Sequence, residues 1–248
     1  MKMKHILNFS SSLCFLLMFT LAQAQEKPTV KSDSLQVADS IPVKKDRYGL
    51  RVGVDLFKLT RGLYDKNYKG IELTGDFRWN KKYYLAAELG NENKTTEDDR
   101  LTSNSKGSYL KAGFDYNMYE NWLDMENIIS IGLRYGFSSF SQELNSYKIY
   151  NPNPYWGELA AIPANQEFNG LSASWIEVVT GMKAKMFNNV FVGFSVQLKT
   201  LVTNKKPEGF DNLYIPGFNR TYNGSFGIGF NYSVTYFIPL YKKKVVVK

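Results

Sequence analysis

The sequence predicts an all-β protein, an eight-stranded antiparallel up-and-down transmembrane β-barrel. Three observations predict this fold. Apolar and polar residues alternate with a period of two between Tyr48 and Ile238, the connections between these segments alternate between short and long, and the chain opens with the pattern of a secretory signal. We therefore expect strands to cross the membrane.

The N-terminus has the layout of a cleaved signal peptide. Lys2 and Lys4 give a basic start, an apolar run extends from residue 13 to 22, and Ala22-Gln23-Ala24 is a small-x-small cleavage site. The apolar run is shorter than the roughly 20 residues that a membrane-spanning helix needs. Residues 1–24 are therefore predicted to be a signal peptide for export.

Cleavage there has a chemical consequence, because His5 is the only histidine and Cys14 the only cysteine. Without imidazole or thiol, the mature chain cannot form a disulfide, a Cys/His metal site or a Ser-His-Asp triad. We predict no cofactor, no metal and no enzymatic activity, and we assign no catalytic residues. A Ser-Lys or carboxylate-only site stays open as an alternative.

The chain is basic, and the loss of Lys2 and Lys4 changes its formal net charge from +8 to +6. The remaining lysines are scattered over strands, loops and tails rather than gathered in one patch, and the chain is predicted to be exported. We therefore expect no nucleic-acid partner.

Eight segments carry the two-residue alternation of strands. Most are about 9–12 residues long, close to the ~9–11 that a tilted strand needs to cross a bilayer. A further hairpin around Asn151-Pro152 would raise the number of strands to ten. The predicted strands are 48–57, 71–79, 83–90, 109–118, 127–138, 175–186, 190–199 and 226–238.

Each predicted strand has two unlike faces. One face is apolar throughout, as at Val52, Leu133 and Val192. The other combines glycines with six acidic and seven basic residues, which we expect to form a charge network in the lumen. These are Arg51, Asp55, Glu72, Asp76, Arg78, Glu88, Lys111, Asp115, Arg134, Glu177, Lys183, Lys185 and Lys199.

Alternation alone does not say which face points outward, because a soluble barrel buries its apolar face and a membrane barrel exposes it. The interior of eight strands has room only for side-chain filling or one small ligand, so the many large apolar side chains would not fit inside. Glycine weakens strands, but it leaves space beside long charged side chains in a narrow lumen. We predict a charged, mostly filled interior whose acids and bases pair, with a narrow solute path as the alternative.

The connections divide into two classes. Links 80–82, 119–126 and 187–189 are short, and they alternate strictly with the long links 58–70, 91–108, 139–174 and 200–225. This alternation is typical of tight periplasmic turns and large external loops. The last two long loops hold candidate contact residues, with aromatics that fold back to cap the barrel as an equal alternative. The candidates are Tyr147, Tyr150, Tyr155, Trp156 and Tyr214.

Two short segments flank the predicted barrel, 48–241, in the mature chain. Residues 25–47 are expected to form a disordered periplasmic arm, and 242–248 a basic C-terminal tail. Within the arm, Asp33-Ser34-Leu35 and Asp39-Ser40-Ile41 resemble the Asp-Ser/Thr-apolar sequon for O-glycosylation in Bacteroidota. Ser34 and Ser40 are therefore candidate glycosylation sites.

Four stretches carry a resemblance to an uncharacterised family of small outer-membrane β-barrels predicted in Bacteroidota. They are Tyr48-Gly49-Leu50-Arg51-Val52-Gly53-Val54-Asp55, Tyr68-Lys69-Gly70-Ile71-Glu72, Tyr84-Leu85-Ala86-Ala87-Glu88-Leu89-Gly90 and Arg134-Tyr135-Gly136-Phe137-Ser138-Ser139-Phe140. The resemblance covers most of 48–241 and implies a fold and a location, but no activity and no site residues. The architecture is similar to that of OmpA- and OmpX-type barrels, which transfers no function.

Together these features predict a monomer in the bacterial outer membrane, in contact with membrane lipid and with an unidentified surface or periplasmic protein partner. We expect a non-enzymatic surface-interaction protein that acts through its external loops. The alternatives are a narrow channel and a barrel that binds lipid or a small ligand.

Overall fold

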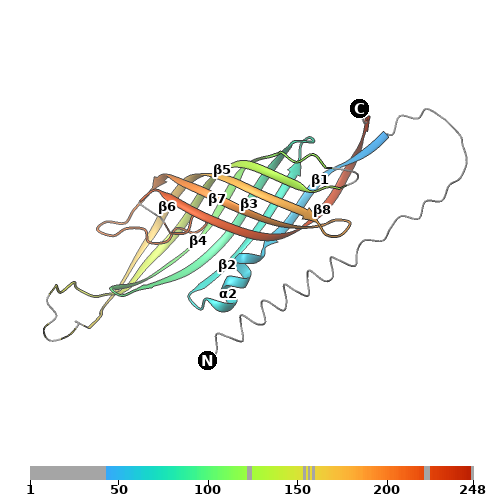
Figure 1. The fold of residues 1–248 in the computed structure, drawn as a ribbon. Helices are drawn as coiled ribbons and strands as arrows, with labels where there is room; N and C mark the ends of the chain where they lie inside the picture. The colour runs from blue at the N-terminus through green and yellow to red at the C-terminus, as the bar shows by residue number, and fades with distance from the viewer. Residues whose placement is uncertain are drawn as a thin grey trace, which may run out of the picture. The chain divides into compact units, whose positions relative to one another are not determined.

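The computed structural model describes residues 43–121, 125–152, 155, 157, 160–220 and 224–246. The predicted signal peptide, Ser34 and Ser40 lie outside these residues. Eight antiparallel strands form a closed barrel, each hydrogen-bonded to its neighbours in sequence and the last to the first (Figure 1). They are β1 (Val43–Asp55), β2 (Tyr68–Arg78), β3 (Tyr83–Asp98), β4 (Leu101–Asn117), β5 (Ile128–Tyr147), β6 (Ile162–Lys185), β7 (Val190–Asn204) and β8 (Phe226–Val246). The predicted eight-stranded up-and-down barrel is confirmed.

Burial alternates along the strands in the sense that the sequence predicts. On β3, Glu88 is 6% exposed and its neighbour Leu89 is 54% exposed; on β5, Arg134 is 6% exposed and Leu133 is 44% exposed. Charged side chains therefore line the interior, and large apolar side chains form the outer surface. This inverts the arrangement of a soluble barrel.

The strands on the long-loop side are longer than predicted. β3 and β4 run on to Asp98 and Leu101, so the predicted loop 91–108 is a hairpin with a two-residue turn. β5 and β6 likewise continue into the predicted loop 139–174, which shortens to 148–161. Their paired ends extend beyond the neighbouring strands (Figure 1). The paired strands in this region are thus extensions of β5 and β6, not a ninth and a tenth strand.

The barrel also extends past its predicted ends at the termini. Residues 43–47 pair with 242–246 as the first part of the β1–β8 ladder, where an arm and a tail were expected. Their sequences are polar, but each segment supplies the backbone partners that the other needs. The ladder is interrupted by one register shift, between Tyr48 and Gly49.

The connection between β1 and β2 is a helix, α2 (Leu56–Tyr64), where the sequence predicted the end of a strand and a loop. β1 stops at Asp55, whose carboxylate accepts a hydrogen bond from the backbone N–H of Phe57 at 2.7 Å and caps the helix. No helix in the described part of the chain is long and apolar enough to cross a membrane.

Helix α2 fills a gap in the barrel wall. β1 pairs with β2 only as far as Val54 and with β8 only as far as Asp55, so 68–72 of β2 and 226–232 of β8 have no β1 partner. Phe57 packs on Phe230 of β8 with ring centroids 4.6 Å apart, and the Arg61 guanidinium lies 4.1 Å from the centroid of the Tyr68 ring on β2. A helix suits this place because its backbone groups bond to one another.

Two glycines of the sheet make a test of this fold. A Cβ on Gly113 would lie 2.0 Å from the carbonyl oxygen of Leu133, whereas a Cβ on Gly75 would meet nothing closer than 3.7 Å. We expect Gly113→Ala to lower the free energy of unfolding by about 1–3 kcal/mol through overpacking, and Gly75→Ala to leave it unchanged. Urea titration in detergent, followed by mobility on unboiled gels, measures both; equal midpoints for the two variants would contradict the close packing of β4 on β5.

Candidate functional site: the sealed polar lumen

The predicted charge network lies inside the barrel. Arg78, Lys183 and Lys185 are partly buried near the short-turn end, and the other ten members are buried. These ten are Arg51, Asp55, Glu72, Asp76, Glu88, Lys111, Asp115, Arg134, Glu177 and Lys199.

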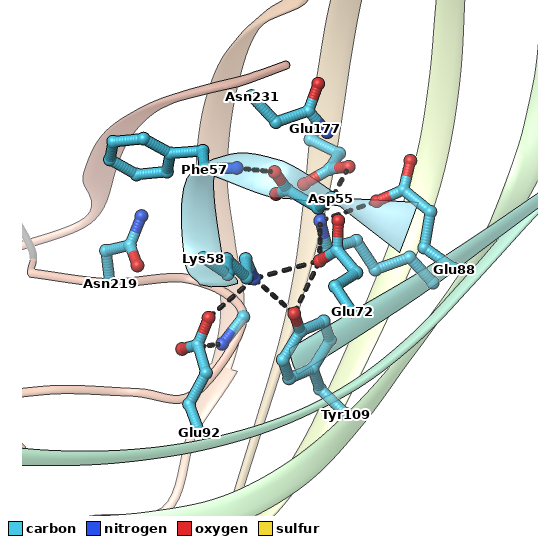
Figure 2. Close-up of polar contacts among 12 residues, drawn as sticks. Asp55, Phe57, Lys58, Glu72, Glu88, Glu92, Tyr109, Glu177, Asn219 and Asn231 are labelled. Carbon is cyan, nitrogen blue, oxygen red and sulfur yellow. Dashed lines mark hydrogen bonds and ion pairs between the residues drawn. The ribbon is translucent and has the colours of Figure 1, made fainter. Parts of the chain in front are cut away.

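Lys111 is the centre of this network. Its Nζ lies 2.7 Å from Glu88 Oε2, 3.4 Å from Glu72 Oε2 and 3.7 Å from Glu177 Oε1. β2, β3 and β6 thus each direct one carboxylate toward the middle of the lumen, as Figure 2 shows for these three glutamates. A buried ammonium needs such partners, because removal from water is costly for an isolated charge.

A second layer lies closer to the short turns. Arg51 Nη2 is 2.5 Å from Asp76 Oδ1, and Lys183 Nζ is 2.5 Å from Asp76 Oδ2, so one carboxylate holds two cations. The Arg51 guanidinium also lies 4.8 Å from the centroid of the Tyr84 ring and 5.4 Å from that of Phe191. Charge pairing and aromatic packing together fill this level.

Arg134 extends the central network to a further carboxylate. Its Nε lies 3.2 Å from Glu88 Oε1, and its Nη2 donates to Asp115 Oδ2 at 2.9 Å. Glu88 therefore contacts both Arg134 and Lys111, and it joins Asp115 through Arg134 to the group around Lys111.

Three lumen residues were absent from the predicted network: Lys58, Glu92 and Tyr109. Lys58 extends inward from α2, with its Nζ 2.9 Å from Glu72 and 2.5 Å from Glu92. Lys58 also donates to the Tyr109 hydroxyl, which donates to Glu72 (Figure 2). Glu92 follows Glu88 at the inward spacing of four, a signal hidden by its assignment to a loop; Lys58 gave no signal in a strand pattern.

The loop between β7 and β8 enters the barrel and covers this network. Glu92 Oε2 accepts hydrogen bonds from the Tyr214 hydroxyl at 2.7 Å and from the backbone N–H of Gly217 at 3.0 Å. Lys199 Nζ donates to the carbonyl of Gly217 at 2.8 Å. Phe218, fully buried, packs edge-on against Trp175 with centroids 5.8 Å apart. We call residues 214–218 the plug.

The plug corrects one prediction about the loops. Tyr214 was a candidate for surface contact, but it is 5% exposed and bound to Glu92. The alternative, an aromatic that folds back to cap the barrel, describes it. The buried carboxylate explains the difference, because Glu92 has hydrogen-bonding capacity that the strands leave unfilled.

Little space remains between the plug, α2 and the charge network. The cavity lined by residues that include Asp55, Lys58, Glu72, Lys111 and Lys199 measures about 10 Å³. A volume of that size holds about one water molecule. The described side chains between the plug, α2 and Lys111 are therefore closely packed.

A smaller cluster of charged side chains lies at the short-turn end. Glu126 accepts hydrogen bonds from Arg47 and lies 3.0 Å from Lys185 Nζ, while Arg47 Nη1 donates to Asn189 at 2.8 Å. Burial raises the pKa of Glu126, but its hydrogen bonds to Arg47 and Lys185 outweigh that effect and hold the pKa below its usual range. The carboxylate is thus kept ionised between two cations.

The other predicted contact residues lie on the outer hairpin formed by the ends of β5 and β6 and the residues between them, 138–174, which we call the β5–β6 hairpin. Tyr147, Tyr150 and Tyr155 are exposed, and the Arg100 guanidinium lies 4.2 Å from the centroid of the Tyr150 ring. Trp156 lies outside the described residues.

Comparison with known proteins places the chain in a family. The model of the family described as "Domain of unknown function (DUF6048)" matches residues 6–243. The chain belongs to this family. Its description carries no activity, and no curated protein matches the chain significantly.

One solved structure is similar to the barrel. It is the crystal structure of Ail, the attachment invasion locus protein of Yersinia pestis, with 11% sequence identity and a TM-score of 0.41. The match covers 77% of this chain and 97% of that one.

The network predicts a large effect of the central lysine. Lys111→Met leaves three buried carboxylates without their shared cation, so we expect the free energy of unfolding to fall by about 3–5 kcal/mol. Lys82→Met, at an exposed position in the β2–β3 turn, is the matched control and should change it by less than about 0.5 kcal/mol.

The double variant Lys111→Met/Glu88→Gln should recover part of the lost stability, because it also removes one of the three carboxylate charges that surround Lys111. Urea unfolding of folded protein in detergent measures all three. Equal midpoints for Lys111→Met and Lys82→Met would contradict a network centred on Lys111.

Proposed function

We propose that this protein is a non-enzymatic outer-membrane surface protein, in which the barrel is a sealed anchor and the β5–β6 hairpin binds a protein partner. The observation that carries this proposal is the contrast between the interior of the barrel and the β5–β6 hairpin. The lumen is filled by its own charges and plug, whereas the hairpin exposes aromatic side chains beyond the apolar belt.

The outer surface supports the membrane location. On β5 the outward residues from Ile129 to Phe137 are all apolar or Tyr, and they cover about 27 Å along the strand. A tilt of roughly 40° reduces this height to about 20 Å, near the ~25 Å apolar band of outer-membrane barrels. Trp79 and Tyr83 are exposed at the short-turn end, where an interfacial aromatic girdle belongs.

The hairpin supports the surface role. From Phe137, where the outward apolar series of β5 ends, the strand continues for ten residues to Tyr147, or about 33 Å along its axis. Ile149 and Tyr150 near its tip are 56% and 63% exposed. Exposed tyrosines supply large contact areas with little loss of conformational entropy on binding.

The alternative of a narrow channel is disfavoured by the filled lumen. Lys111 contacts groups on non-adjacent strands, Lys199 contacts the plug, and Glu92 contacts Lys58 of α2. A solute path would require these buried ion pairs to separate, which is costly. The β1–β8 pairing closes the barrel, and α2 covers the stretch where β2 and β8 have no β1 partner, in keeping with a monomer.

A conductance measurement tests the sealed lumen. Folded protein inserted into planar bilayers should show no stable current steps above the bilayer background, because the plug and the charge network occupy the lumen. Insertion is verified in the same membranes by protease protection of the barrel. Reproducible open currents from the inserted protein would contradict the role of a sealed anchor.

Photo-cross-linking on intact cells tests the binding role of the hairpin. A photoreactive residue at position 150 should give a discrete cross-linked species, and the same residue at position 82 in the opposite turn should not. Tyr147→Ser/Tyr155→Ser, made beside the probe at 150, should reduce the yield several-fold through loss of contact area. The hairpin would have no such role if the yields at 150 and 82 were the same.

A further inference from the structure

An apolar groove crosses the outer face of β1–β4. Its volume is about 490 Å³, within the range of ligand-binding pockets. Its floor is made by Gly75 and Ala87, which lie side by side in register on β2 and β3, and large side chains that include Leu73, Leu89 and Leu110 border it. The groove exists because two of the outward positions carry almost no side chain.

On β2–β4, the border of the groove nearest the long loops leads to a polar surface. Two residues beyond the leucines, the outward row reads Ile71, Asn91 and Ser108, with the Asn91 amide donating to the Ser108 hydroxyl at 2.9 Å. Uncharged amides and hydroxyls continue on this face of β3–β5, at positions that suit the hydroxyl groups of a sugar.

A pair of lysines lies one row further out. Lys69 is in register with Asn93, and Asn93 is in register with Lys106, so the two lysines stand on either side of one asparagine. Both are exposed, and neither forms an ion pair with a described residue. Their Cα atoms are separated by two strand spacings, about 10 Å, so both ammonium groups can reach one anion placed above Asn93.

The apolar groove, the uncharged polar row and the lysine pair follow one another along the strands, in the same order as the acyl chain, sugar and phosphate of a glycolipid. From the leucine border to the lysine row is four residues on each strand, or about 13 Å along the strand. The opposite wall lacks this order: the outward series of β7 continues from Leu198 through Thr200 to Val202 without a charge. Lysines next to a membrane surface attract anionic headgroups.

We propose that this face of β1–β4 binds a phosphorylated glycolipid of the outer leaflet. An acyl chain occupies the groove over Gly75 and Ala87, the sugar headgroup contacts the row of Asn91 and Ser108, and a phosphate is held between Lys69 and Lys106. This site is independent of the β5–β6 hairpin and its partner.

Native mass spectrometry from lipid nanodiscs tests the proposal. The discs contain phosphatidylcholine doped with one probe at a time: bisphosphorylated lipid A, the same lipid without its phosphates, or phosphatidylglycerol. We expect the barrel to retain lipid A through release from the disc, and to retain each of the other two at least ten-fold less. Equal retention of phosphatidylglycerol would overturn the glycolipid as the ligand.

Variants locate the site. Lys69→Gln/Lys106→Gln removes the proposed phosphate contacts. Gly75→Leu/Ala87→Leu fills the groove, and a Cβ at Gly75 would meet only ordinary van der Waals contacts. Each pair should reduce lipid A retention at least ten-fold. The matched control, Lys81→Gln/Lys82→Gln, removes two charges from the opposite end of β2 and β3 and should leave retention unchanged.

All variants are first checked for the folded gel mobility of the wild type, and the lysine pair, which is exposed, keeps the test decisive if the groove variant does not fold. Retention that is insensitive to Lys69→Gln/Lys106→Gln, or reduced as much by the control pair, would overturn the proposal.

Discussion

A charge inside a narrow barrel must have a partner, and this constraint fixes the register of the strands. Arg51 lies directly opposite Asp76, Glu88 opposite Lys111, and Glu177 opposite Arg134 on one side and Lys199 on the other. A slip of one residue between two strands would turn such a pair toward the outer surface and an apolar residue inward. The charged pairs therefore oppose a one-residue slip between these strands, whatever their net contribution to stability.

The same constraint extends to the two segments that are not strands. Glu72 and Glu92 lie where β1 has ended, so no cation from that strand can reach them. Lys58 from α2 contacts both, and the plug supplies Glu92 with the Tyr214 hydroxyl and the Gly217 amide. Helix α2 is thus held by the acids that Lys58 neutralises, and the plug by its hydrogen bonds to Glu92, so this part of the β7–β8 loop becomes part of the interior.

The sequence predicted the barrel, the sense of its two faces and the inward charges, because each strand repeats the same period in its own residues. It predicted the long-loop end of the barrel poorly. Glu92 was not predicted as a lumen residue because its neighbours Asn91 and Asn93 are also polar. Beyond the apolar belt both faces of β3 are therefore polar, although the pairing of β3 with β4 continues. The inward positions of Lys58 and Tyr214 depend on contacts with residues far away in the sequence, and a local pattern of residues does not predict such contacts.

Because its own side chains fill the lumen, the binding surfaces that we propose lie on the outside of the barrel. Above the apolar belt the wall is uneven: β5 and β6 continue into a hairpin with exposed tyrosines, and β2–β4 carry a groove, uncharged polar groups and two lysines. Rigid strands hold both surfaces, because the interior pairs fix the register that sets each outward position. The buried network thus determines which side chains meet the lipid and which meet the medium, because the register that its pairs fix sets every outward position of the same strands.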